Sequence, residues 1–181
     1  GYKDTIKKEF KPKMGNLIYP DNIDWEKLYY NPAEREQIET LTTALDDTNY
    51  KDLVERMRLQ GMKAGFSVLL YGFPGTGKTS SVKQIAKATG RSIYMVEIDK
   101  IQSKWVGESE KNLAKVFEEY KYCKKYFNID PILLFNEADA ILGKRFNVNS
   151  AVDKTFNALQ NILLQELEDF EGIFMATTNL A

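Results

Sequence analysis

The stretch SVLLYGFPGTGKT, residues 67–79, decides the fold, because a short β-rich run leads through a glycine-rich turn into a helical pattern. Residues 72–79 fit the pattern GxxxxGK[ST], in which successive main-chain N–H groups surround a polyphosphate. Gly75 and Gly77 permit backbone conformations that other residues avoid, and the positive end of the following helix faces the same anion. The stretch therefore predicts a phosphate-binding loop. The alternative is a glycine-rich turn that happens to precede a helix.

Two side chains at the end of this loop carry chemistry. Lys78 supplies a mobile positive charge for the outer phosphates, and the Thr79 hydroxyl is placed to bind the magnesium ion that accompanies them. The predicted nucleotide-binding residues are Pro74, Gly75, Thr76, Gly77, Lys78, Thr79 and Ser80.

Strand-like and helical segments alternate through the rest of the sequence. The strand-like runs are 67–71, 92–98, 132–135 and 172–178, and helical spacing of apolar residues marks 78–89, the segment after residue 108, and 152–170. Strands separated by helices indicate right-handed crossovers and a parallel sheet covered on both faces. We therefore predict an α/β fold of P-loop NTPase type, a parallel sheet flanked by helices.

The sequence ahead of this core predicts a helical lead-in. Asn31 reads as an N-cap, followed by a proline at the first helical position and by Glu34 at the third. We divide the chain into a tail or linker over residues 1–30, a helical lead-in segment over 31–64, and a nucleotide-binding core over 65–181.

The apolar run ILLF, residues 132–135, ends on two polar residues, Asn136 and Glu137. A carboxylate there can accept a proton from an attacking water or orient that water, and the sequence has no histidine to compete for this role. The Asn136 amide can accept a hydrogen bond from a magnesium-bound water but brings no negative charge. The alternative for Glu137 and Asp139 is ordinary solvation at a strand end. Because ligands bind beyond the carboxyl ends of parallel strands, we expect Gly72, Asn136 and Asn179 to converge.

The net charge, the cysteine count and the distribution of apolar residues narrow the classes of protein to which this chain can belong. The net charge of −1 argues against a nucleic-acid partner, and a single cysteine, Cys123, excludes an internal disulfide. No apolar run approaches the length of a membrane span, and the N-terminus lacks the apolar core of a secretory signal. These features predict a cytoplasmic protein without membrane contact.

Four motifs occur in order, GFPGTGKT, SKWVGESEKNL, ILLFNEADAI and ATTNL, and over residues 65–181 the chain resembles the AAA+ ATPases, in particular bacterial members of the classical AAA group. The resemblance implies ATP and magnesium as cofactors, binding of ATP and ADP, assembly of the full-length protein as a homo-hexamer, and hydrolysis coupled to pulling a protein substrate through a central pore. It assigns catalytic roles to Lys78, to Glu137 as the base, and to Asn179 as the sensor of the γ-phosphate or attacking water. The pore loop would carry Trp105 and Val106.

Two departures from the family pattern limit these expectations. Asn136 stands where most members carry aspartate, which predicts weaker metal binding through water. The sequence stops at Ala181, just after the sensor, so we expect the fifth strand, the arginine finger and the C-terminal lid to be absent and this fragment to be weakly active or inactive. Arg145 follows the third strand too closely to match the finger, and we interpret it as a solvated loop residue.

Several alternatives stay open at this point. Trp105 can equally pack in the core, and Asn179 can simply cap a turn. The leading function is an ATPase that remodels a protein partner. The rival is a nucleotide-binding switch or scaffold with little hydrolysis, and the third candidate is a DNA-dependent loader or helicase.

Overall fold

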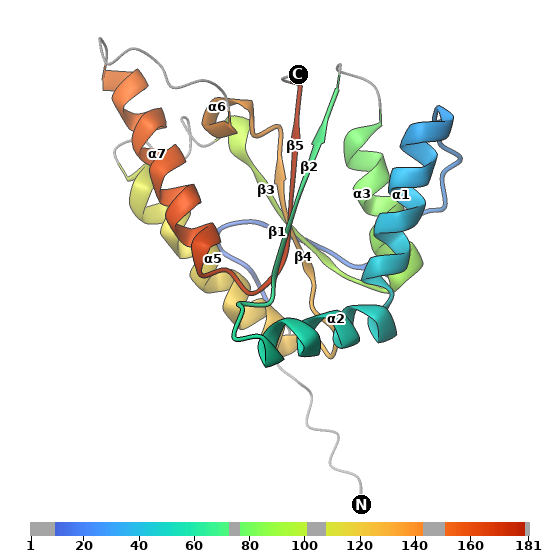
Figure 1. The fold of residues 1–181 in the computed structure, drawn as a ribbon. Coiled ribbons are helices and arrows are strands. Elements are labelled where there is room, and N and C mark those ends of the chain that lie inside the picture. Colours follow the sequence, from blue (N-terminus) through green and yellow to red (C-terminus); the bar gives the residue numbers. More distant parts are fainter. Residues whose placement is uncertain (1–9, 73–76, 101–107, 143–150, 180–181) are drawn as a thin grey trace, which may run out of the picture.

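The computed structural model describes residues 10–72, 77–100, 108–142 and 151–179. In this part of the chain, five strands form one sheet in the order β1-β3-β4-β5-β2 (Figure 1). The strands are β1 (Asn16–Ile18), β2 (Gly65–Tyr71), β3 (Ile93–Glu97), β4 (Ile132–Asn136) and β5 (Gly172–Thr178). All neighbours pair in parallel except β1, which is antiparallel to β3. The predicted α/β class is confirmed.

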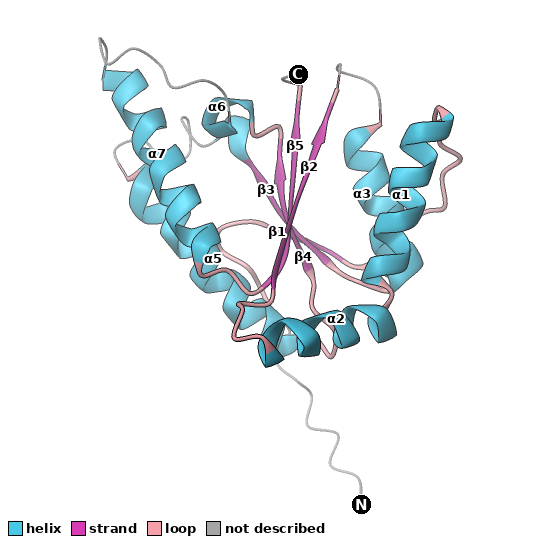
Figure 2. Ribbon diagram, viewed as in Figure 1, coloured by secondary structure: helices cyan, strands magenta, loops and turns pink. Residues whose placement is uncertain are grey.

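Helices cover both faces of the sheet (Figure 2). They are α1 (Pro32–Leu45), α2 (Asp47–Leu59), α3 (Lys78–Thr89), α5 (Ser109–Tyr126), α6 (Asp139–Leu142) and α7 (Ala151–Glu168), with short 3-10 turns η1 (Pro20–Asn22) and η2 (Ile98–Lys100). α1 and α3 lie on one side, α5, α6 and α7 lie on the other, and α2 crosses the end where the strands begin (Figure 1). None of the helices in the described ranges combines the length and the apolar character needed to cross a membrane.

Along the three central strands, β3, β4 and β5, successive side chains point to opposite faces of the sheet. They pack into two separate hydrophobic cores. Tyr94, Leu133 and Phe174 are aligned in register and pack toward α5 and α7. Their sequence neighbours Ile93, Ile132 and Ile173 pack with residues of α1, α2 and α3. Because both faces are covered, β4 and β5 read as continuous apolar runs rather than as alternating ones.

Part of the segment that the sequence predicted to be a tail or linker joins the sheet instead. We call residues 10–18 the N-terminal strap. The main-chain N–H groups of Lys13 and Met14 donate to the Glu119 carboxylate on α5 at 2.9–3.0 Å, and β1 then pairs with the edge of β3. The three residues of β1 are too few to show a strand pattern, and their partners are remote in sequence, so the sequence alone gave no sign of this contact.

The first lead-in helix, α1, begins where the sequence predicts. The Asn31 side chain accepts a hydrogen bond from the Glu34 main-chain N–H at 2.8 Å, as an N-cap does, and Pro32 is the first residue of α1. A residue that the sequence analysis did not single out, Arg91, holds the α1–α2 corner against the sheet. Its guanidinium is fully buried and donates to the main-chain carbonyls of Leu45, at 2.8 and 3.0 Å, and Asp130, at 2.7 Å.

Candidate active site

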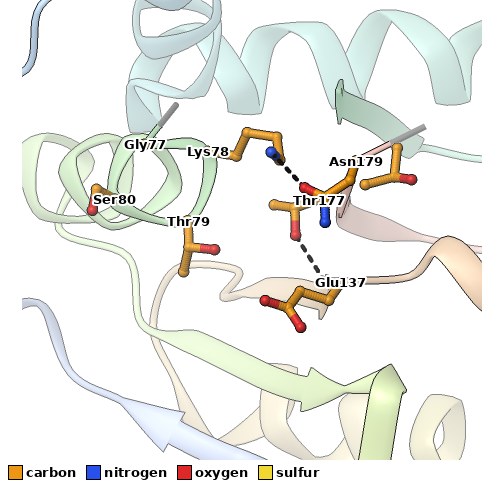
Figure 3. Close-up of a pocket in the computed structure, with 8 residues that line it drawn as sticks. Gly77, Lys78, Thr79, Ser80, Glu137, Thr177 and Asn179 are labelled. Carbon is orange, nitrogen blue, oxygen red and sulfur yellow. Dashed lines mark hydrogen bonds between the residues drawn. The ribbon is translucent and has the colours of Figure 1, made fainter. Parts of the chain in front are cut away.

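A cavity of about 230 Å³ lies where the carboxyl ends of the parallel strands meet the first turn of α3 (Figure 3). Open α/β sheets bind ligands at this edge. The cavity draws its walls from the start of α3, the turn after β4 and the end of β5. Its lining residues are Gly77, Lys78, Thr79, Ser80, Glu137, Thr177, Thr178 and Asn179.

Lys78 joins the two sides of this cavity. Its ammonium donates to the Gly72 main-chain carbonyl at 3.0 Å and to Asn179 Oδ1 at 2.9 Å (Figure 3). Gly77, just before it, has φ +79°, a left-handed conformation that favours glycine. Lys78 is the first residue of α3. At this end of a helix, main-chain N–H groups and the helix dipole attract an anion.

Thr79 and Asn136 form the part of the site that suits a magnesium ion. The Thr79 hydroxyl donates to Asn136 Oδ1 at 2.6 Å, so the lone pairs of the Thr79 oxygen remain available to a cation. Mg²⁺ bound with a nucleotide takes oxygen ligands and keeps several waters, and one hydroxyl is a fitting protein ligand. Among the described residues, no three His, Cys, Asp or Glu side chains are arranged to hold a metal.

The Asn136 oxygen has a second protein donor. The Thr177 hydroxyl donates to the same Oδ1 at 2.9 Å. The oxygen that the sequence analysis assigned to a metal-bound water thus accepts two protein hydroxyl groups. In this arrangement the Asn136 amide orients the Thr79 hydroxyl.

Glu137 sits on a constrained turn directly after β4. Its φ of +52° is left-handed, which is uncommon for a residue other than glycine. Its main-chain N–H donates to Thr177 Oγ1 at 2.9 Å, and its exposed side chain lines the cavity (Figure 3). A hydrogen bond with Asp99, together with the negative charge of Asp99, raises the pKa of Glu137 above its ordinary value.

Asp139 fixes the end of β5. Its Oδ1 accepts hydrogen bonds from the Thr178 hydroxyl and, at 2.8 Å, from the Asn179 main-chain N–H. Ordinary solvation at a strand end, the alternative for Asp139, does not describe this carboxylate. Asn179 in turn points its amide oxygen at Lys78, so it contributes a polar group to the cavity.

The structure brings together Lys78, Thr79, Glu137 and Asn179 in one cavity, with Gly77 and Ser80 beside them. Pro74, Gly75 and Thr76, the predicted pore-loop residues Trp105 and Val106, and Arg145 lie outside the described residues.

Sequence reasoning missed Thr177, which contacts both Asn136 and Glu137. The only signal was a pair of threonines just before Asn179, and such a pair is also ordinary strand composition.

A comparison with protein families agrees with this geometry. The model of AAA, the ATPase family associated with various cellular activities, matches residues 68–181, which is more than half of the chain. The match begins within β2 and contains every residue that lines the cavity. The chain therefore belongs to the AAA family of ATPases.

Proposed function

We propose that this chain is a magnesium-dependent ATPase module whose ATP hydrolysis drives remodelling of a protein partner. Family membership implies nucleotide binding and ATPase activity in general. The observation that supports hydrolysis most directly is the single cavity shared by Lys78, Glu137 and Asn179, which come from α3, the turn after β4 and the end of β5.

Each side chain has a role that its position supports. The Lys78 ammonium and the N–H groups at the start of α3 hold the outer phosphates, and the Thr79 hydroxyl binds the accompanying Mg²⁺. Bound there, Mg²⁺ would neutralise charge on the phosphate oxygens. Glu137 orients the attacking water and accepts its proton, and Asn179, next to Lys78, contacts the terminal phosphate or that water.

The proposed partners follow from the family. AAA proteins bind nucleotide and often form oligomers. We propose a homo-hexamer for the full-length protein, with Trp105 and Val106 contacting a protein substrate. An exposed aromatic side chain offers a large contact area whatever the sequence of the partner.

A second candidate function is a nucleotide-binding switch or scaffold with little hydrolysis. The observation that favours it is Asn136, whose amide places no negative charge beside Thr79 and whose oxygen is shared by two hydroxyl donors. A weakly held metal would let the chain bind nucleotide and turn it over slowly.

Calorimetry with Mg²⁺ and ATP tests the binding step. Lys78→Ala should lower the affinity by about a hundredfold, because the variant loses the charge that faces the phosphates. Lys83→Ala is a matched control, since it removes a positive charge from the same helix outside the cavity. Equal affinities for the wild type and Lys78→Ala would contradict nucleotide binding at this site.

Phosphate release by the full-length protein separates the two candidates. We expect Glu137→Gln to bind ATP as the wild type does and to lower turnover by about a hundredfold or more, because its amide cannot accept a proton. If the wild type and Glu137→Gln are equally inert, the switch is the correct function.

A further inference from the structure

We propose that Thr177 is a positioning residue for hydrolysis, because its hydroxyl links the main chain of Glu137 to the amide that orients Thr79. This inference rests on the proposed function. It adds a residue of β5 that belongs neither to the phosphate loop nor to the Asn136-Glu137 pair.

Thr177 contacts both sides of the Asn136-Glu137 pair. Its side chain is buried, with 1% of the residue surface exposed, at the end of β5. The hydroxyl oxygen accepts the Glu137 main-chain N–H at 2.9 Å (Figure 3), and the hydroxyl hydrogen goes to Asn136 Oδ1, also at 2.9 Å. The Thr177 main-chain carbonyl accepts the Ala138 N–H at 2.8 Å.

The Glu137 main-chain N–H sets the direction of the hydrogen bond that it shares with Thr177. An amide N–H can only donate, so the Thr177 oxygen accepts from Glu137 and its single hydrogen is free for Asn136. The amide oxygen of Asn136 faces the two threonines and accepts a hydrogen bond from each hydroxyl group. The result is a hydroxyl relay, in which Glu137 N–H donates to Thr177, and Thr177 and Thr79 both donate to Asn136.

The relay matters because Glu137 has a left-handed backbone. A residue with a Cβ atom keeps such a conformation only where its surroundings determine it. Thr177 holds the N–H groups of two successive residues, Glu137 and Ala138, and so defines where the Glu137 carboxylate enters the cavity. The Thr177 hydroxyl contacts the Glu137 main chain and the Asn136 amide at the end of β4, so its loss should affect turnover more than nucleotide affinity.

Steady-state ATPase assays on three variants of the full-length protein test this role. Thr177→Val keeps the branched shape but loses the hydroxyl, and we expect kcat to fall by about tenfold or more while KM for ATP stays within about twofold. Thr177→Ser restores the hydroxyl and should keep kcat within about threefold of the wild type. Thr89→Val is a matched control, because it removes a hydroxyl that donates to the Ile85 carbonyl in the last turn of α3, outside the cavity.

The possible outcomes lead to different conclusions. Unchanged kcat in Thr177→Val, with an active wild type, overturns the positioning role and leaves the ATPase function intact. A loss that Thr177→Ser does not restore, or that comes with an equal rise in KM or with lost folded protein, shows a merely structural role and also overturns the inference. A wild type no more active than Lys78→Ala overturns the proposed hydrolysis and the inference with it.

Discussion

At a single position this site departs from the family pattern. Asn136 stands where that pattern leads one to expect an acidic residue. Its oxygen accepts the hydroxyl groups of Thr79 and Thr177, so the amide is held in place without a charge. An aspartate at the same position could give one oxygen to both hydroxyl groups and turn the other, with its negative charge, toward a hydrated cation. The amide therefore keeps the geometry of the site but brings no negative charge that could attract a cation.

This reasoning predicts the effect of restoring the acid. Asn136→Asp should lower the Mg²⁺ concentration needed for half-maximal ATP binding by about tenfold, because a nearby negative charge is worth on the order of 1 kcal/mol or more. Titration of Mg²⁺ at fixed ATP measures this change. Asn128→Asp, which adds the same charge at an exposed position just before β4, should leave the midpoint where it was. A midpoint in Asn136→Asp at or above the wild-type value would contradict the prediction.

At the scale of elements, β2 and β5 begin with a pair of glycines. Gly65 and Gly172 are partners in the register of these strands. A Cβ at Gly65 would lie 2.0 Å from the Phe170 carbonyl oxygen, and one at Gly172 would lie 2.5 Å from the Tyr120 hydroxyl. That hydroxyl is itself fixed, because it donates to the Pro131 carbonyl at 2.6 Å. The starts of both strands thus depend on residues without side chains.

Gly172→Ala is expected to destabilise the fold strongly. It forces a methyl group against a buried tyrosine and a φ of +128° on alanine, and we expect the free energy of unfolding to fall by about 2–4 kcal/mol. Gly61→Ala is the control, since it has φ +73° but nothing within 4 Å of the added Cβ, and it should cost only about 1 kcal/mol. Urea denaturation measures both changes. Equal losses in the two variants would show that the contact with Tyr120 is unimportant.

Elements were predictable from the sequence where local chemistry determines them. The N-cap at Asn31 and the bounds of α3 and β5 all agree with the pattern. The buried Arg91 could not be found in this way, because its acceptors are carbonyls 46 and 39 residues away. Thr177 was missed for the same reason, since its partner Asn136 is 41 residues distant and a strand threonine carries no mark of its role.

At the scale of the whole molecule, the N-terminal strap extends the sheet at the β3 edge. The Glu119 carboxylate accepts the main-chain N–H groups of Lys13 and Met14 and the hydroxyl of Tyr94, which lies 2.7 Å away. Burial of Tyr94 and its hydrogen bond to Glu119 raise the pKa of the phenol, so the hydroxyl stays protonated and remains a donor. One side chain on α5 therefore joins the strap, the helix and β3.

Removing this carboxylate should weaken the attachment of the strap. Glu119→Ala leaves two main-chain N–H groups and a buried hydroxyl without their acceptor, and we expect a loss of about 2–4 kcal/mol in the free energy of unfolding. Hydrogen exchange should accelerate over residues 13–18 in the same variant. Glu118→Ala, at the exposed neighbouring position, is the control and should change neither quantity. Unchanged exchange in Glu119→Ala would mean that β1 pairing alone holds the strap.

The course of the strap also has a practical consequence for handling the protein. Its first described residue, Phe10, lies against Tyr126 at the last turn of α5, which is the pole of the molecule opposite the cavity (Figure 1). A sensor surface that captures the protein at this far pole leaves the cavity facing the solution.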